Sequence, residues 1–483
     1  QKRLHPAFHR LQLWQCRMKP FLMFPAEFIH TLEIHFGEER THRLLSALSA
    51  EPSLSVRANL AKISTEGLAE YFYDYYDGIV PWCPEGLYLK SRPSFTLDPL
   101  FHAGYYYVQE ASSMYTGVLL KRAISQLSEG SPFDRFGVSP SSDRPEGSIS
   151  TEGPGLRLLD LSAAPGGKST HILSIIDPND LLVSNEVIRS RASILAENIA
   201  RWGYPNVVVS NNDPADFIAL DDFFDIVLVD APCSGEGMFR KDPDALKEWS
   251  VDNVRLCASR QRRIVSDIWQ ALRSGGYFIY STCTFNTLEN DENVAWIASE
   301  LGAELIEQRQ FLPGEERGEG FFIALLRKNG DYYPSVKNLA IKKSQIPACA
   351  SYILQDLGQF TFSLKGDLWK VIPSQLVTDI KALESSLKVI RSGVAVAVQK
   401  GRDMIPEADL ALSMVLDKKA FHTVELSIED ALKFLSKENL VFGTEVPLGY
   451  LLVCFEGAPL GFVKNLGRRS NNLHPISRRI RMQ

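Results

Sequence analysis

The sequence predicts a doubly wound α/β sheet in the middle of the chain, preceded by a helical extension and followed by a small mixed or β-rich domain. Two observations carry this prediction. Short apolar runs, rich in leucine and β-branched residues, recur between residues 156 and 282, and helical patterns separate them. Buried parallel strands read as continuous apolar runs, and their alternation with helices is typical of doubly wound sheets. At 483 residues the chain is also long enough for two or three domains.

The region before the sheet, residues 1–120, is predicted to be mostly helical because Phe28, Leu32 and Phe36 follow helical spacing. The next segment, 126–155, has sixteen Ser, Gly or Pro among its thirty residues. Such a composition cannot bury enough apolar surface to offset the entropy of ordering the chain, so we expect a flexible insertion.

The α/β core is expected at residues 156–330. Its predicted strands are 156–162, 181–185, 206–210, 224–230 and 276–282, with an additional candidate at 321–326. Its predicted helices are 168–176, 190–202 and about 252–273. The pattern then changes. Residues 335–384 are interpreted as a linker and intermediate region, and 385–483 as a small final domain. Strand-like runs dominate both regions from residue 360 to the end of the sequence, at 360–364, 368–372, 387–398, 450–455 and 460–464.

Composition excludes some classes of protein. No run approaches eighteen apolar residues, so a membrane span is not expected. Seven scattered cysteines, an odd number, argue against a disulfide framework and favour the reducing cytoplasm, where a cysteine can serve as a nucleophile.

Charge gives a local signal only. The net charge of −6 does not indicate nucleic-acid binding, but the segment from Lys464 onwards contains six Lys or Arg and no acid. A solvated basic segment and an RNA-binding surface remain equal alternatives. The candidate RNA-binding residues are Lys464, Arg468, Arg469, Arg478 and Arg479.

A glycine-containing turn follows the first predicted strand. Its residues are Ser162, Ala163, Ala164, Pro165, Gly166, Gly167 and Lys168. Two glycines between a strand and a helix let the backbone approach a ligand, and the helix start offers free N–H groups. Alone, the turn is a weak signal that an ordinary βα connection would explain as well.

Acids close the next three predicted strands. Glu186 ends the second, Asp213 follows the third and Asp230 closes the fourth. An isolated strand-end acid is usually a helix N-cap. Three of them at one edge of a parallel sheet, together with the glycine turn, favour a nucleoside cofactor whose ribose hydroxyls bind Glu186.

Two cysteines lie at the same edge. Cys233 comes just after the fourth strand and Cys283 ends the fifth. If these strands are neighbours, both thiols border the cofactor crevice. A lone cysteine is most often a small buried hydrophobe. The sequence has no C-x-x-C and no ligand pair at metal spacing, so we expect no metal.

Three segments, 159–168, 225–240 and 280–292, closely resemble the Sun-type family of RNA (cytosine-5) methyltransferases. They contain Ala-Pro-Gly-Gly-Lys, Asp-Ala-Pro-Cys-Ser-Gly-Glu-Gly and Ser-Thr-Cys-Thr, in this order. The resemblance extends over nearly the whole chain from residue 24. Its C-terminal part, notably 387–392 and 461–479, is similar to the branch that modifies bacterial small-subunit ribosomal RNA and ends in a PUA-like RNA-binding domain. The chain departs from the family at the Ser/Gly/Pro-rich segment and at Ser162, where relatives often have cysteine.

The resemblance implies a class I, Rossmann-like methyltransferase that uses S-adenosylmethionine, with an RNA-binding N-terminal extension. Residues 162–168 would surround the methionine part of the cofactor, Glu186 would bind its ribose and Asp213 would lie near its adenine. Asp230 would close the pocket and contact the target base. Cys283 would be the nucleophile and Cys233 would help to release the product.

Alternatives remain at this point. A DNA cytosine methyltransferase would use Cys233, in its Pro-Cys, as nucleophile. An RNA-binding ribosome-assembly factor with a vestigial site is a second alternative, and transfer RNA instead of ribosomal RNA is a third. The prediction is a cytoplasmic enzyme that methylates carbon 5 of a cytosine, with ribosomal RNA or the small ribosomal subunit as its partner.

Overall fold

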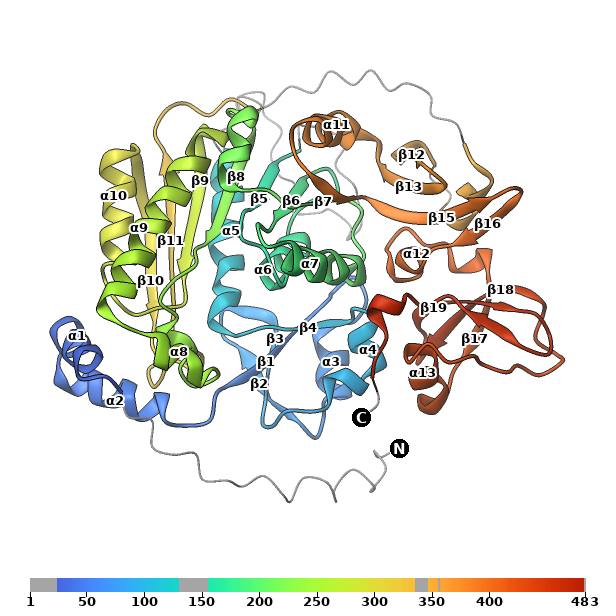
Figure 1. Cartoon of the computed structure of the whole chain (residues 1–483), viewed down its shortest axis with the longest axis horizontal. Helices are drawn as coiled ribbons and strands as arrows, with labels where there is room; N and C mark the ends of the chain where they lie inside the picture. Colours follow the sequence, from blue (N-terminus) through green and yellow to red (C-terminus); the bar gives the residue numbers. More distant parts are fainter. Residues whose placement is uncertain (1–23, 130–154, 335–345, 355–356, 482–483) are drawn as a thin grey trace.

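The computed structural model describes residues 24–129, 155–334, 346–354 and 357–481. Figure 1 shows a central sheet, an N-terminal part below it and a C-terminal part to the right, and the N-terminal part shares a hydrophobic core with the C-terminal part. Most of the predicted flexible insertion and the first part of the predicted linker, residues 335–345, lie outside the described residues. The first residues assigned to the insertion, 126–129, are helical: they end α5 (Thr116–Glu129), and Leu127 is buried.

The central sheet has eight strands in the order β10-β11-β9-β8-β5-β6-β7-β14. Five neighbouring strands, β7, β6, β5, β8 and β9, are parallel, and β11 runs antiparallel to both β9 and β10. The bounds are β5 (Arg157–Asp160), β6 (Leu181–Asn185), β7 (Val207–Ser210), β8 (Phe224–Asp230), β9 (Leu272–Thr282), β10 (Ala303–Phe311), β11 (Phe321–Lys328) and β14 (Val389–Ser392). The predicted doubly wound sheet is confirmed.

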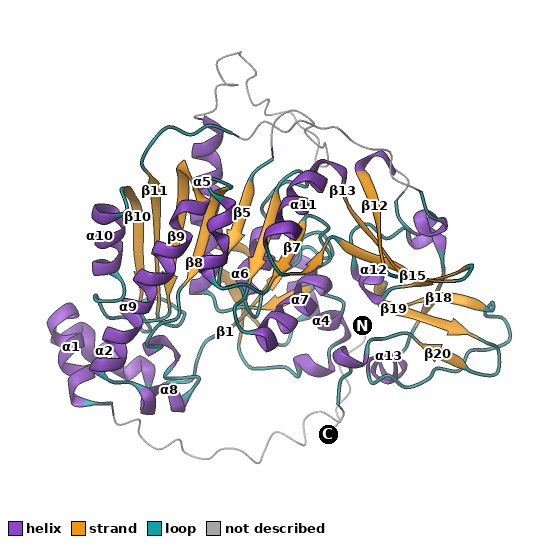
Figure 2. Cartoon of the chain, turned by 45° about the horizontal axis from the view of Figure 1, so that its top comes forward, coloured by secondary structure: helices purple, strands orange, loops and turns teal. Residues whose placement is uncertain are grey.

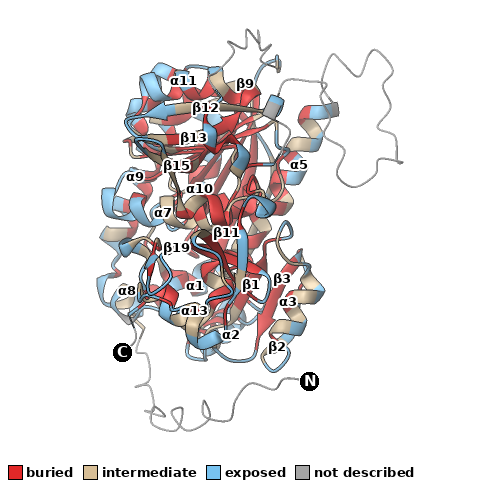
Figure 3. Ribbon diagram, turned by 90° about the vertical axis from the view of Figure 1, so that its right-hand side faces the viewer, coloured by how far each residue is buried: buried red, intermediate tan, exposed pale blue. Residues whose placement is uncertain are grey.

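Helices cover both faces of this sheet, as Figures 2 and 3 show. One face packs against α5, α6 (Gly167–Leu173) and α7 (Arg189–Trp202). The other packs against α9 (Val251–Ile268), α10 (Asp291–Glu300) and α11 (Val377–Ser386). Adjacent residues of β5 point to opposite faces, so Leu158 and Leu159 enter different cores. This two-sided burial explains why the strands read as continuous apolar runs.

The prediction of a mostly helical N-terminal region is wrong for residues 54–108. Beyond α1 (Ala26–Phe36) and α2 (Glu38–Leu48), the chain forms a four-stranded sheet in the order β2-β3-β1-β4, with α3 (Thr65–Tyr71) and α4 (Pro99–His102). The strands are β1 (Leu54–Ala58), β2 (Tyr76–Val80), β3 (Cys83–Leu89) and β4 (Tyr106–Val108). β3 contains Pro84 and Gly86, which are rare inside strands, so pairing with β1 and β2 overrides local preference.

The predicted linker and intermediate region, 335–384, is also corrected where it is described. It contains β12 (Phe360–Lys365), β13 (Leu368–Pro373) and α11, whose Ile380 and Leu383 join the core of the central sheet. The run at 387–398, predicted as one strand, forms two. β14 pairs with β7, and β15 (Val394–Lys400) pairs with β13. Gly393 separates them with φ +63°, and a Cβ there would lie 2.3 Å from the Val371 carbonyl oxygen.

The C-terminal part contains two four-stranded sheets, β12-β13-β15-β16 and β17-β18-β19-β20. Its remaining elements are β16 (Asp403–Pro406), α12 (Ala408–Leu412), β17 (His422–Glu425), α13 (Ile428–Leu435), β18 (Gly449–Phe455), β19 (Ala458–Asn465) and β20 (Ser470–Asn472). The mixed, β-rich character predicted for this part of the chain is confirmed. Within the described residues, no helix combines the length and the apolar character that crossing a bilayer requires.

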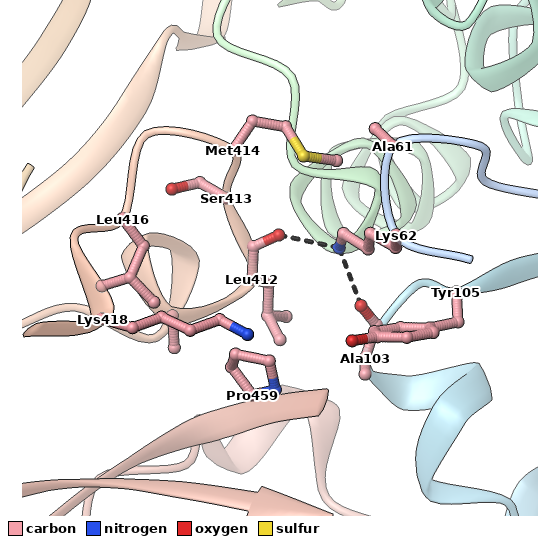
Figure 4. Close-up of a pocket in the computed structure, with 11 residues that line it drawn as sticks. Ala61, Lys62, Ala103, Tyr105, Leu412, Ser413, Met414, Leu416, Lys418 and Pro459 are labelled. Atoms are coloured by element: carbon pink, nitrogen blue, oxygen red, sulfur yellow. Dashed lines mark hydrogen bonds between the residues drawn. The ribbon is translucent and has the colours of Figure 1, made fainter. Parts of the chain in front are cut away.

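Lys62 links the three parts of the chain. Its Nζ donates hydrogen bonds to the carbonyl oxygens of Ala103 (2.8 Å), Arg201 (2.7 Å) and Leu412 (2.8 Å), at the C-terminal ends of α4, α7 and α12. These ends carry partial negative charge, which attracts an ammonium group, but burial and the nearby Lys418 lower the pKa of Lys62 to about 7. Lys62 borders a cavity of about 240 Å³ that Lys418 also lines (Figure 4). Because all three N–H donors of an ammonium are used, Lys62 serves as a structural link and not as a ligand-binding cation.

Candidate active site

The glycine turn connects β5 to α6 at the carboxyl edge of the central sheet. Gly166 precedes the first residue of α6 with φ +117°, a backbone conformation that favours glycine. α7 holds the turn from the side: Asn198 Nδ2 donates to the Pro165 carbonyl oxygen and Arg191 Nη2 to that of Ala164, both at 2.8 Å. The turn is therefore fixed, with the N–H groups that begin α6 facing the strand ends.

The predicted strand-end acids lie along one edge, because β7, β6, β5 and β8 are consecutive neighbours in the sheet. Glu186 follows β6, and its Oε1 accepts the Ile188 backbone N–H at 2.9 Å. Asp213 caps the 3₁₀ helix Pro214–Leu220 by accepting the Ala215 N–H at 3.2 Å, and its side chain is 45% exposed. Asp213 thus has the capping role that an isolated strand-end acid usually has. Its contact with adenine stays a prediction.

Asp230, at the end of β8, is held by two side chains. Its Oδ2 lies 2.8 Å from Lys168 Nζ, and its Oδ1 accepts the Ser281 hydroxyl at 2.8 Å. The carboxylate is 36% exposed at the edge where the thiols lie. It therefore joins the glycine turn to the cysteine-bearing strands.

Asp160, the last residue of β5, is a site residue that sequence reasoning missed. The Ser169 hydroxyl donates to its Oδ2 at 2.6 Å, whereas its buried Oδ1 has no hydrogen-bond partner. Buried polar atoms are rarely left unpaired unless a ligand or water completes them. A carboxylate oxygen without a partner beside the glycine turn is a candidate to bind a cationic group of a ligand. The missed signal was an acid directly before the turn.

Burial raises the pKa of Asp160 to about 7 from 3.8, and the nearby carboxylates of Asp230 and Glu186 act in the same direction. Between these two values the folded protein holds a proton that the unfolded chain has lost. The free energy of unfolding therefore falls as pH rises through this window, by at most about 1.4 kcal/mol per pH unit from this group.

Asp160→Asn is expected to remove this dependence. Relative to the wild-type protein, the variant should gain stability steadily from about pH 4 to about pH 7. Urea denaturation of both proteins without cofactor, over a series of pH values, measures the difference. Two parallel stability curves would contradict the assignment.

The two cysteines lie against each other. Cys233 Sγ and Cys283 Sγ are 3.0 Å apart, and the Cys283 backbone N–H donates to Cys233 Sγ at 3.3 Å. Their strands, β8 and β9, are parallel neighbours. The hydrogen bond with Cys283, together with burial, raises the pKa of Cys233 well above its usual range. Cys233 therefore favours its protonated thiol form.

Comparison with known proteins gives the family. The model of "16S rRNA methyltransferase RsmB/F" matches residues 152–327. Models of the "N-terminal domain of 16S rRNA methyltransferase RsmF" and the "Methyltransferase RsmF PUA domain" match 24–111 and 421–480. "Ribosomal RNA small subunit methyltransferase F" of Citrobacter koseri is 31% identical over 87% of this chain and 89% of its own. The chain belongs to this family. The Erwinia tasmaniensis protein of the same name is 29% identical over 94% of this chain and 96% of its own.

Solved structures agree on the fold. "The crystal structure of NSun6 from Pyrococcus horikoshii with SFG" superposes with a TM-score of 0.51 at 22% identity, over 64% of this chain and 99% of that one. "Crystal Structure of PH0851" gives 0.53 at 22% identity, over 63% and 66%. The protein is an S-adenosylmethionine-dependent RNA methyltransferase with a Rossmann-like catalytic domain and a C-terminal PUA domain, as predicted.

The predicted RNA-binding residues of the methyltransferase divide into two groups. Arg468, Arg469 and Arg479 are exposed. Arg478, by contrast, is 10% exposed and binds Asp409 on α12 at 2.6 Å, so a phosphate contact does not fit its position. Lys464 is paired with Asp403 at 2.9 Å. The basic segment that begins at Lys464 is not an extended tail, because it forms β20 and the end of β19. Counting charges along the sequence could not distinguish the exposed bases from those that form ion pairs within the fold.

One trio of metal-ligating residue types is formed by folding. Cys83 and Glu85 on β3 and His171 on α6 are buried, with ligand atoms within 4.8 Å of one another. His171 Nε2 lies 3.2 Å from Glu85 Oε1, and this contact links the N-terminal sheet to the helix that follows the glycine turn. The absence of a metal stays a prediction.

Proposed function

We propose that this methyltransferase transfers the methyl group of S-adenosylmethionine to carbon 5 of a cytosine in 16S ribosomal RNA, through a covalent bond between Cys283 and carbon 6. The observation that carries the proposal is the pair of thiols, 3.0 Å apart, at the edge that also holds the glycine turn and the strand-end acids. The relatives named for the ribosomal small subunit support the substrate.

The chemistry requires a nucleophile because carbon 5 of cytosine is too weak a nucleophile to accept a methyl group unaided. Addition of the Cys283 thiolate to carbon 6 makes carbon 5 enamine-like and splits one difficult step into two. S-adenosylmethionine supplies the electrophilic methyl group. Asp230 is placed to stabilise the protonated ring nitrogen of the adduct. After transfer, a base takes the proton of carbon 5, the freed electron pair re-forms the double bond between carbons 5 and 6, and Cys283 leaves as its thiolate. Cys233, beside Cys283, is the residue that we assign to this release.

The alternatives differ in substrate or in nucleophile. A DNA-type enzyme would attack with Cys233, but the raised pKa of this thiol disfavours its thiolate. A vestigial RNA-binding protein would not need two thiols beside a formed cofactor turn. Transfer RNA remains the second candidate substrate. A ribosomal substrate also implies the cytoplasm, which stays a prediction.

The direct test is methylation with tritiated S-adenosylmethionine of four substrates: naked 16S ribosomal RNA, small subunits, transfer RNA and DNA. We expect incorporation into the ribosomal substrate, followed by a single class of protected cytosines in bisulfite sequencing. Incorporation only into transfer RNA or DNA would replace the proposal, and incorporation into none would support the vestigial alternative.

The exposed arginines of the PUA domain are expected to bind phosphates. Replacing Arg468, Arg469 and Arg479 by alanine should weaken RNA binding and lower the slope of log affinity against log salt by about 0.7–0.9 per lost contact. Filter binding over a salt series measures the slope. Arg255→Ala, on the exposed face of α9, is the matched control. If the triple variant keeps the wild-type slope, these arginines are only a solvated surface.

A further inference from the structure

Two buried carboxylates lie directly behind the cysteines. Glu236 follows Cys233 on the loop after β8, and Glu289 follows Cys283 on the loop after β9. Both side chains are almost completely buried, at 1% and 0% exposure. The mechanism above uses neither of them. A buried carboxylate is costly unless hydrogen bonds compensate for the loss of water, so the partners of these two reveal their role.

Glu236 binds the opposite loop. Its Oε2 accepts the backbone N–H groups of Phe285 (2.8 Å) and Asn286 (3.1 Å), the second and third residues after Cys283. Its Oε1 accepts the indole N–H of Trp249 at 2.9 Å. The acid from the Cys233 loop therefore holds the backbone of the Cys283 loop.

Glu289 makes the reverse connection. Both of its oxygens accept the backbone N–H of Ser234, the residue after Cys233, at 3.0 and 3.3 Å. Gln261 Nε2 donates to its Oε2 at 2.6 Å. Asn286 Nδ2 joins the two acids, with 2.7 Å to Glu289 Oε1 and 3.1 Å to Glu236 Oε1. Each of these bonds comes from an N–H donor, and the donors at Glu289 partly offset the burial that raises the pKa of this carboxyl.

We propose that Glu236 and Glu289 are positioning residues that form a crossed lock, each holding the loop of the other, and so fix the two thiols against each other. The proposal of a lock depends on the proposed function only because that function assigns the roles of the two thiols. Its contacts begin one residue after Cys233 and two residues after Cys283. A loss of either carboxylate therefore allows the thiols to separate.

The lock also has an electrostatic consequence. The negative charge of Glu289 adds to the effects that raise the pKa of Cys233, after the hydrogen bond with Cys283, burial and the charge of Cys283. Glu289 thus helps to keep the proton on Cys233. Geometry and charge act in the same sense, toward a protonated Cys233 held beside Cys283.

The test uses the RNA-free protein and the variants Glu236→Gln and Glu289→Gln. A glutamine brings an NH₂ group against the N–H donors, so one bond of the lock must break. Iodoacetamide labelling from pH 6 to 10, read at each cysteine by mass spectrometry, should show Cys233 labelled at lower pH in both variants. Methylation should lose up to about a hundredfold in kcat, as expected when reacting groups shift by about 1 Å, while the KM for S-adenosylmethionine stays unchanged.

Two further variants keep the test decisive. Asn286→Ala leaves both acids in place but removes the bridge, together with the Asn286 hydrogen bonds to Ser234 Oγ, Thr284 Oγ1 and the Glu289 N–H. It should shift the pH profile of Cys233 labelling by a smaller amount than the glutamine variants do. Asp98→Asn is the matched control: Asp98 is a half-buried carboxylate of the N-terminal part that likewise accepts several hydrogen bonds, from Tyr71 Oη, Tyr106 Oη and the Leu100 N–H. Asp98→Asn should lower the free energy of unfolding without shifting the pH profile of cysteine labelling.

The outcomes separate the two proposals. If the glutamine and Asn286 variants keep the wild-type labelling profile and kcat, while losing stability as Asp98→Asn does, the carboxylates are only structural and the lock is overturned. If the profile shifts but the wild-type protein methylates none of the RNA substrates tested, the lock stands and the proposed function fails.

Discussion

Cys283→Ala is expected to abolish methylation and to leave no covalent complex with RNA, whereas Cys233→Ala is expected to accumulate one. Addition to carbon 6 and departure from it are separate steps, so losing a group needed only for departure traps the intermediate. The 3.0 Å separation of the two sulfur atoms places both within reach of one ring.

Denaturing gels with labelled RNA read both variants directly, because only a covalent complex survives denaturation. Cys454→Ala, at a buried cysteine of β18 in the C-terminal part, is the matched control and should resemble the wild-type protein. A trapped complex in Cys283→Ala but not in Cys233→Ala would reverse the roles and favour the DNA-type arrangement. Full activity in both variants, without a complex, would remove covalent catalysis.

The sequence predicted the central sheet closely because burial on both faces leaves a clear trace. The runs at 181–185 and 224–230 coincide with β6 and β8. The N-terminal sheet left no such trace, since its strands are short and β3 contains Pro84 and Gly86. The sequence also could not assign β14 to the central sheet. A strand-like run shows that a strand forms, but its pairing with β7 depends on tertiary contacts.

The sequence likewise predicted only some residues of the candidate site. Both cysteines could be placed at one edge because they follow strands that were expected to be neighbours. Asp160, Glu236 and Glu289 were missed because an acid in a motif looks the same whether it is exposed or buried. Only the structure reveals that these carboxylates have lost contact with water. Arg478 is the opposite case: it was predicted at the surface and is paired with Asp409 inside the fold.

Glu186→Ala is expected to weaken S-adenosylmethionine binding by about a hundredfold to ten-thousandfold. The reason is the loss of two charge-assisted hydrogen bonds to the ribose hydroxyls, each worth about 1.5–3 kcal/mol. The Ile188 N–H binds one carboxylate oxygen of Glu186 at 2.9 Å, Arg191 Nη1 lies 3.5 Å from the other, and Asn211 Nδ2 binds the backbone oxygen at 2.8 Å. Isothermal titration calorimetry with S-adenosylmethionine measures the affinity.

The control for Glu186 is Asp213→Asn, because asparagine also caps helices well and the substitution removes only the charge. If Asp213 serves solely as the cap seen at Ala215, this variant binds the cofactor as the wild-type protein does. A loss of affinity in Asp213→Asn would instead support its predicted place near the adenine. An unchanged affinity in a folded Glu186→Ala protein would contradict the assignment of Glu186 to the ribose. No second acid at the end of β6 could replace the lost carboxylate.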